Sequence, residues 1–260
     1  MPKHKTKDLT RLKYPRGRTR LHDWGVETAK AHGINLKPFH GVIVVFNAQT
    51  DSGSAGGHRV VIGFPKTDWN PSFNCHEIGH GYDYGHSWSA RPDVEYGDPW
   101  DIMSAMRVFT FKNKFGRNGP GMNACNLHKI GAIPAPRIWS SNKSGSTTIT
   151  LAALNRPEAA GYLMALIGPA AGSASKTSYF VEFRQKKGWD AGILRDTVLV
   201  HEVRSNGTCY ILSRVNRADP VAMQVRPGEE FKIAARPLTI KALSFDAVAA
   251  TAKVTVTIGK

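Results

Sequence analysis

The segment His-Glu-Ile-Gly-His-Gly-Tyr-Asp-Tyr-Gly-His, which begins at His76, limits the local structure of this chain more than any other. His76 and His80 are four residues apart, and a helix places side chains with that spacing on one face, about one turn apart. Asn70 is a residue type that caps helices, and Pro71 suits the first helical position. We therefore predict a helix over residues 71–82 that presents two imidazole groups to a single cation.

Two further residues of this segment suit metal-dependent chemistry. Glu77 lies beside the first histidine, and His86 follows His80 as a third candidate ligand. Catalytic zinc sites use three protein ligands and one open position, and the zinc lowers the pKa of its bound water to about 7. A neighbouring carboxylate can take a proton from that water as it attacks a peptide carbonyl. The sequence thus predicts one catalytic zinc ion bound by His76, His80 and His86, with Glu77 as the general base of a zinc-dependent endopeptidase.

A second motif, Asp-Pro-Trp-Asp-Ile-Met-Ser, begins at Asp98 and contains Met103. The two motifs together resemble the metzincin signature, in which H-E-x-x-H-x-x-G-x-x-H is followed by a methionine-containing turn. Met103 stands at the position of that turn methionine, and the surrounding residues are most similar to the gametolysin-like and immune-inhibitor-A-like secreted metallopeptidases. The resemblance covers roughly residues 36–215 and is specific over 76–104. It implies a metzincin-like peptidase with an accessory β-domain, an extracellular location, and protein or glycoprotein substrates.

One position departs from this signature, because Asp83 stands where the family has glycine. The glycine lets the backbone turn sharply after the helix, so that the third ligand can reach the metal. Aspartate is among the few other residues that tolerate the left-handed conformation, so we expect Asp83 to make this turn rather than to bind the metal. The tyrosine that some metzincins carry after the turn methionine is replaced by Ala105, which leaves Tyr82, Tyr84 and Tyr96 as candidates for stabilising an oxyanion.

The departure at Asp83 also keeps a second function class open. If the turn does not form, the chain would be a catalytically inactive, zinc-containing binding or adhesion module. Cleavage of a generic protein substrate by the wild type and by Glu77→Gln, with and without a chelator, separates the two hypotheses.

Apolar segments rich in β-branched residues, separated by turn residues, predict several strands. In the amino-terminal half we expect a helix over 21–33, strands over 41–46 and 59–64, and a short helix over 122–130. Residues 87–104 are rich in Pro, Asp, Gly and Trp, so we expect irregular structure there. Eight later segments have the strand pattern: 147–153, 160–168, 177–185, 197–203, 208–215, 230–235, 237–243 and 252–258.

These elements predict an α+β metzincin-like zinc peptidase domain over residues 21–140, followed by an all-β sandwich-like domain over residues 141–260. Residues 1–20 contain eight Lys or Arg and one Asp, and we interpret them as a basic arm that could be disordered.

The net charge of +15 is unevenly distributed along the chain. Residues 107–143 are basic, like the amino-terminal arm, whereas residues 66–106 are acidic overall, which suits a cation site. No nucleic-acid-binding motif accompanies the basic segments, so we expect no nucleic-acid partner. No apolar run reaches the roughly 18–20 residues of a membrane span, and the first residues lack the apolar core of a signal peptide. The sequence is therefore compatible with an intracellular location and with secretion after removal of a leader. It does not indicate the oligomeric state.

Three aspartates, Asp93, Asp98 and Asp101, offer carboxylates for a calcium ion, although hydrogen bonds that stabilise turns are the interpretation we favour. His201 is followed by a glutamate but has no histidine four residues later, so we expect a structural or surface role for it.

Three cysteines are too few for a disulfide scaffold. A bridge between Cys75 and Cys125 and buried free thiols are both compatible with the sequence.

Overall fold

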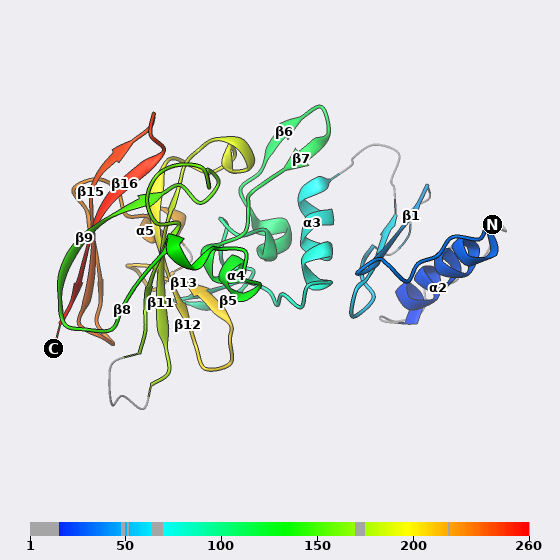
Figure 1. Cartoon of the computed structure of the whole chain (residues 1–260), viewed down its shortest axis with the longest axis horizontal. Coiled ribbons are helices and arrows are strands. Elements are labelled where there is room, and N and C mark those ends of the chain that lie inside the picture. The colour runs from blue at the N-terminus through cyan, green and yellow to red at the C-terminus, as the bar shows by residue number, and fades with distance from the viewer. Residues whose placement is uncertain are drawn as a thin grey trace. The chain divides into compact units, whose positions relative to one another are not determined.

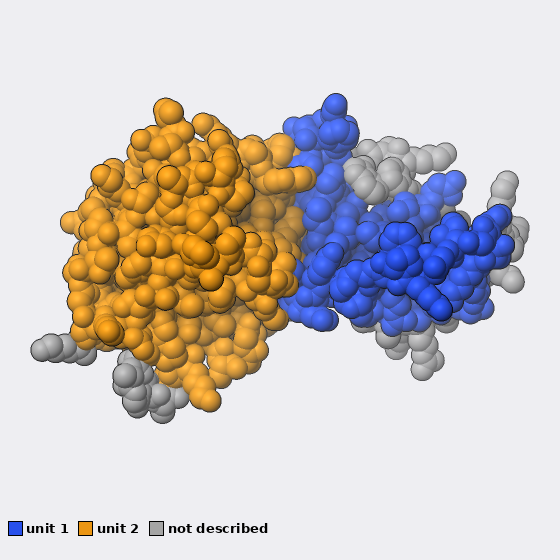
Figure 2. Space-filling view, viewed as in Figure 1, with its two compact units in different colours: residues 1–85, 112–118 blue, residues 86–111, 119–260 orange. Residues whose placement is uncertain are grey.

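The computed structural model describes residues 16–47, 50, 52–63, 70–169, 175–217 and 219–259. Contacts divide the chain into two compact units, Met1–Gly85 with Lys112–Asn118, and His86–Phe111 with Gly119–Lys260 (Figure 2). This division differs from the expected boundary near residue 140. Of the predicted basic arm, residues 1–15 lie outside the described residues, and residues 16–20 form the start of a helix.

The first unit contains a helix, α2 (Arg16–Ala31), that contacts a three-stranded sheet (Figure 1). Strand β1 (Val42–Phe46) pairs in parallel with β3 (Arg59–Gly63), and β2 (Gly53–Ser54) pairs antiparallel to the other edge of β3. The predicted strands over 41–46 and 59–64 are confirmed as β1 and β3, except that Phe64 lies outside the described residues. Val44 and Val61 of these strands pack with Leu21 and Trp24 of the helix. The helix begins at Arg16, earlier than the predicted residue 21. The core consists of Leu21, Phe46 and Val61, with Trp24 and Val44 packed against it.

Two further elements complete the first unit. Helix α3 (Pro71–His80) contacts the sheet strands β2 and β3, and it also contacts β7 (Gly116–Asn118). Strand β7 pairs with β6 (Phe111–Asn113) in a hairpin, where the side-chain amide of Asn118 donates to Asn113 Oδ1 at 2.7 Å. The predicted helix over 71–82 is confirmed, with its regular part ending at His80.

The second unit contains two sheets whose facing sides share one apolar core (Figure 1). The seven-stranded sheet has the order β5 (Asp93–Glu95), β4 (Trp88–Ala90), β13 (Cys209–Ile211), β12 (Thr197–Val203), β11 (Ser178–Arg184), β10 (Met164–Ile167) and β8 (Ile138–Ser141). The four-stranded sheet has the order β14 (Glu230–Ile233), β15 (Leu238–Asp246), β16 (Thr251–Ile258) and β9 (Gly145–Ala152). All eight predicted carboxyl-terminal strands are confirmed.

The central strands of the seven-stranded sheet, β11 and β12, are buried on both faces. Val198 and Val200 of β12 face the core between the sheets, whereas Leu199, between them, packs with Trp100 and Ile193 on the opposite face. On that opposite face, α4 (Ala124–Lys129) packs through Ala124 and Cys125, and α5 (Pro220–Met223) packs through Met223. The short helix predicted over 122–130 is confirmed as α4.

The predicted fold class, an α+β metzincin-like peptidase domain followed by an all-β sandwich-like domain, is wrong. The structure is mostly β, with 36% strand, 20% helix and several sheets. Part of this strand content comes from the segment 87–104, which we expected to be irregular. Its strand β4 pairs in parallel with β13, at Tyr210↔Trp88 and Ile211↔Ser89, and β5 pairs with β4. Each of these strands has three residues, which is too few for an alternation of apolar and polar side chains to be recognised. They are strands because they pair with partners that are distant in the sequence or with one another.

The longest described helix, α2, has 16 residues and is rich in charged side chains. Among the described helices, none combines the length and apolar character that crossing a membrane requires.

Candidate metal centre

Helix α3 supplies three of the predicted site residues, His76, Glu77 and His80. Its amino terminus is fixed by Asn70, whose side chain accepts a hydrogen bond from the backbone N–H of Phe73 at 3.1 Å, and by Pro71 in the first turn. His76 and Glu77 are buried, with exposures of 3% and 7%.

The two histidines of α3 are placed as two ligands of one ion would be. Their Nε2 atoms are 3.1 Å apart. Two ligands bonded to one zinc ion at about 2.0–2.1 Å are roughly 3.1–3.4 Å apart when the angle at the metal is about 100–110°. The observed separation therefore fits a shared cation.

The other ring nitrogen of His80 is held by the backbone, because Nδ1 lies 2.8 Å from the carbonyl oxygen of Tyr84. A carbonyl can only accept, so Nδ1 carries the proton and Nε2 keeps its lone pair for a metal. Glu77 is held in a similar way, since its Oε2 accepts the backbone N–H of Ser54 at 2.7 Å.

Asp83 lies in the turn that ends α3, in the left-handed conformation with φ 61°. The backbone N–H of Asp83 donates to the carbonyl of His80 at 3.1 Å, and the N–H of Tyr84 donates to the carbonyl of Gly79 at 3.2 Å. These two bonds form a Schellman motif, in which the left-handed residue is usually glycine. Asp83 thus reverses the chain at the position where the signature has glycine, shortly before His86.

His86 begins the second unit, where its ring has two polar neighbours. Nδ1 lies 2.5 Å from Glu95 Oε1, and Nε2 lies 3.1 Å from the hydroxyl of Tyr96. The next residue, Ser87, donates its backbone N–H to the carbonyl of Met103 at 3.2 Å. Met103 is fully buried, and this bond ties the predicted methionine turn to the chain beside His86.

One ligand atom from each of His76, His80 and His86 lies within 4.8 Å of the others, and this group could hold a metal ion. Three imidazole nitrogens are a donor set that suits zinc, copper, iron or nickel, and does not suit calcium or magnesium. The residues present therefore fit the zinc ion that the sequence predicts. Two supporting residues were missed at the sequence level, Glu95 and Ser54, because no motif or spacing marks them.

Replacing Glu95 by Gln should weaken zinc binding by about 10–100-fold. The carboxylate orients His86 through Nδ1, and loss of such outer partners of a ligating histidine typically has an effect of this size. Zinc affinity can be measured by competition with a chromogenic chelator. The matched control is Asp93→Asn on the same strand, because the carboxylate of Asp93 pairs with Arg204 instead. Equal zinc affinities for the two variants would contradict this role of Glu95.

The three aspartates considered for calcium are each engaged in other contacts. Asp93 pairs with Arg204, Asp98 accepts the backbone N–H of Trp100 at 3.0 Å, and Asp101 accepts the backbone N–H of Met103 at 3.1 Å. Within the described part of the chain, only the histidine group gathers three or more candidate ligands.

Burial, together with the charge of Asp98, raises the pKa of Asp101 to about 7.

His201 forms a fully buried pair with Asp98, with Nε2 2.9 Å from Oδ2. Burial by itself would lower the pKa of His201, but the negative charges of Cys209, when it is ionised, and of Asp98 raise that pKa to about 10. The predicted structural role fits this buried position.

The His201–Asp98 pair should make folding stability depend on pH. The folded pKa lies above the ordinary value of 6.5, so the contribution is fully present below about pH 6.5 and is lost as the pH rises towards about 10. Urea unfolding of the wild type and of His201→Gln, at about pH 6 and about pH 9.5, tests this linkage. We expect the stability difference between the two proteins to shrink at the higher pH; a constant difference would contradict the charged pair.

No disulfide forms among the three cysteines, which are all free. Cys75 is exposed on α3, whereas Cys125 and Cys209 are buried, and burial raises the pKa of both buried thiols. The suggested Cys75–Cys125 bridge is therefore wrong, and the alternative of free thiols applies.

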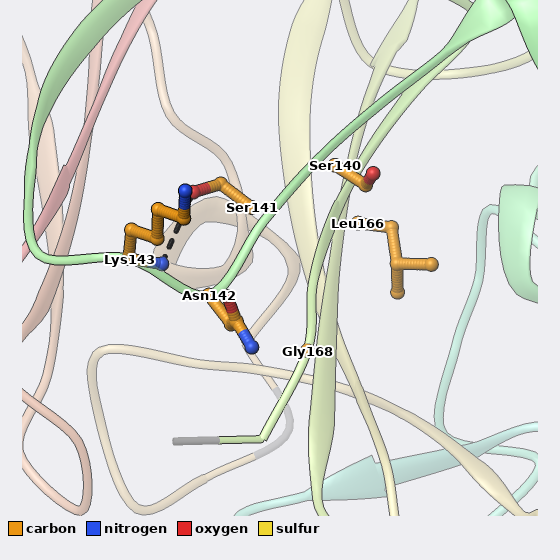
Figure 3. Close-up of a pocket in the computed structure, with 6 residues that line it drawn as sticks. All are labelled: Ser140, Ser141, Asn142, Lys143, Leu166 and Gly168. Atoms are coloured by element: carbon orange, nitrogen blue, oxygen red, sulfur yellow. Dashed lines mark hydrogen bonds between the residues drawn. The ribbon is translucent and has the colours of Figure 1, made fainter. Parts of the chain in front are cut away.

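A pocket of about 500 Å³ lies in the second unit between the ends of β8 and β10 (Figure 3). Among the described residues that line it, none is a candidate metal ligand and one carries a charged side chain, Lys143, whose backbone N–H donates to Ser141 Oγ at 3.2 Å. These described residues include no acid–base pair, so the histidine group is the better candidate for catalysis.

Comparison with protein-family models, curated proteins and solved structures finds no match to this chain.

Proposed function

We propose that this protein is a zinc-dependent endopeptidase. The observation that carries the proposal is the grouping of His76, His80 and His86 within 4.8 Å, with Glu77 directly beside the first of them in the sequence. The resemblance of segment 76–104 to the metzincin signature supports the same chemistry, although the fold expected from that resemblance is not observed.

Zinc, when bound, would polarise a peptide carbonyl and make a water molecule acidic enough to be deprotonated near neutral pH. His80 and His86 would bind it as neutral imidazoles, because each has Nδ1 committed to an oxygen acceptor, Tyr84 O and Glu95 Oε1. His76 would add the third imidazole nitrogen.

Glu77 is the proposed general base. Its carboxylate would take a proton from the attacking water and deliver it to the departing amine. The hydrogen bond from the Ser54 N–H fixes the orientation of the carboxylate, and the low exposure of Glu77 limits competition from solvent. The chain thus supplies both the proton acceptor and the means of holding it in place.

Substrates are proposed to be proteins or glycoproteins, met outside the cell, in line with the secreted peptidases that the signature resembles. The alternative, an inactive binding module, depended on Asp83 failing to make the turn after α3. That alternative gains no support, because Asp83 adopts the left-handed conformation that the turn needs.

Metal removal and restoration test the proposal. A generic unfolded protein substrate should be cleaved by the purified chain, cleavage should cease after dialysis against a chelator, and stoichiometric zinc should restore it. His80→Ala should bind zinc poorly and should not be reactivated, while His32→Ala, an exposed histidine at the end of α2, should behave as the wild type. Cleavage that survives complete metal removal would exclude the proposed function.

A further inference from the structure

The hairpin of β6 and β7 carries three positive charges around its tip. The two strands run side by side and are joined at residues 114 and 115 (Figure 1). Lys112, Lys114 and Arg117 are all exposed. Among the described residues none of the three has an ion-pair partner, and the sequence contains no Asp or Glu from residue 102 to residue 157. Like charges so close together repel one another, so the tip attracts a negatively charged surface.

An apolar ring lies among these charges. Phe115 is 59% exposed, and Lys114 Nζ lies 4.9 Å from the centroid of its ring. A ring beside ammonium groups matches the boundary of a lipid bilayer, where the ring can enter the apolar region while the cations stay at the headgroups. An anionic polysaccharide would pair with the cations equally well, but it offers no apolar region for the ring.

Two asparagines fix the shape of the tip. Asn113 Oδ1 accepts the backbone N–H of Phe115 at 2.8 Å and Nδ2 of Asn118 at 2.7 Å. Nδ2 of Asn118 also donates to the carbonyl oxygen of Gly116 at 2.8 Å, and the Asn118 side chain is buried. These contacts hold Phe115 in one conformation, which reduces the entropy lost when the tip binds a partner.

We propose that the tip of this hairpin binds the surface of a bilayer that contains anionic lipids. Lys112, Lys114 and Arg117 contact the charged headgroups, and Phe115 enters the boundary between headgroups and acyl chains. Strand β7 contacts helix α3, so binding holds the helix with the candidate metal ligands His76 and His80 near the membrane. The proposal goes beyond the peptidase function and depends neither on a bound metal nor on catalysis.

Partition of the purified full chain onto vesicles, measured by sedimentation, tests this proposal. The wild type should bind vesicles of phosphatidylcholine with about one quarter phosphatidylserine, and should bind vesicles of phosphatidylcholine alone much more weakly. Replacing Lys112, Lys114 and Arg117 together by Gln should lower the partition coefficient by roughly 100-fold, about fivefold for each charge. Phe115→Ser should lower it by about tenfold, because the apolar ring is lost.

The whole chain is strongly basic, so the control must remove the same charge elsewhere. Lys176, Arg195 and Lys253 are exposed in the second unit and have no ion-pair partner in the described part of the chain. Replacing these three by Gln gives the same net charge as the hairpin variant, and this control should bind the anionic vesicles much more tightly than that variant. Circular dichroism checks that each variant keeps its fold.

The outcomes are distinct. Equal partition of the two triple variants would overturn the proposal, because net charge alone would then account for binding. Unchanged partition of Phe115→Ser would also overturn it and would indicate a site for an anionic polymer. Vesicle binding is measured without substrate or zinc, so its failure would leave the proposed peptidase standing, and failure of the peptidase tests would leave the membrane contact standing.

Discussion

Replacing Glu77 by Gln should lower kcat/KM for peptide hydrolysis by about 10²–10⁴-fold, the usual contribution of a general acid–base residue. Gln has nearly the same shape, and its amide oxygen can still accept the Ser54 N–H, so the fold of α3 and its contact with β2 should persist. What is lost is the ability to take up and return a proton. The measurement is steady-state cleavage of a fluorogenic peptide, with zinc content determined on the same sample.

Two comparisons make this result specific. Zinc should stay bound in Glu77→Gln, because the three histidine nitrogens are unchanged. The control Glu27→Gln alters an exposed glutamate on α2 that pairs with Arg20, and it should leave the rate unchanged. Equal rates for wild type and Glu77→Gln would remove Glu77 from the mechanism and with it the proposed function.

Replacing Arg184 by Met should lower the free energy of unfolding by about 3–5 kcal/mol, the usual effect of breaking a buried ion pair. The guanidinium lies between two carboxylates: Nη1 is 3.1 Å from Glu182 Oε1, and Nε is 2.8 Å from Asp190 Oδ2. All three side chains are at most 1% exposed. Met fills much of the same volume but leaves two buried carboxylates without a cation. Urea denaturation followed by circular dichroism measures the change.

A second variant shows whether the cause is the unpaired charge. Glu182 and Asp190 also accept the backbone N–H groups of Ala124 and Gly121, at 2.5 Å and 3.0 Å, so the cluster joins the loop before α4 to the sheet. Adding Asp190→Asn to Arg184→Met removes one orphaned charge, and the pair should be less destabilising than the sum of the two single changes. Arg217→Met, at an exposed ion pair, should have little effect. Additive effects would point to lost packing instead.

The buried polar cluster shows why part of the architecture could not be predicted. Five ionisable side chains of this cluster are fully buried: Asp98, Asp101, Glu182, Asp190 and His201. From residue type alone, aspartate and glutamate are expected at the surface or in turns. Each is stabilised by a partner that is distant in sequence, as in the Asp98–His201 contact. Seven strands in one sheet create a face wide enough to bury these pairs, and that sheet includes β4 and β5, which have no local signal.

The sequence by itself determined the features that depend on local spacing. These are the helix that begins at Pro71 with its Asn70 cap, the alignment of His76 and His80 one turn apart, and the strands of the carboxyl-terminal half. Each follows from the periodicity of a helix or strand, which a few consecutive residues encode.

Only the tertiary structure decided what surrounds those features. The pairing of β4 with β13 created strands where irregular structure was expected, and the end of β5 with the residue that follows it placed Glu95 and Tyr96 on the two ring nitrogens of His86. The physical reason is that strand partners and contacts to a ligand's second nitrogen are chosen by long-range packing. No spacing within the chain specifies them, so the identity of the groups around His86 becomes visible only once the chain is folded.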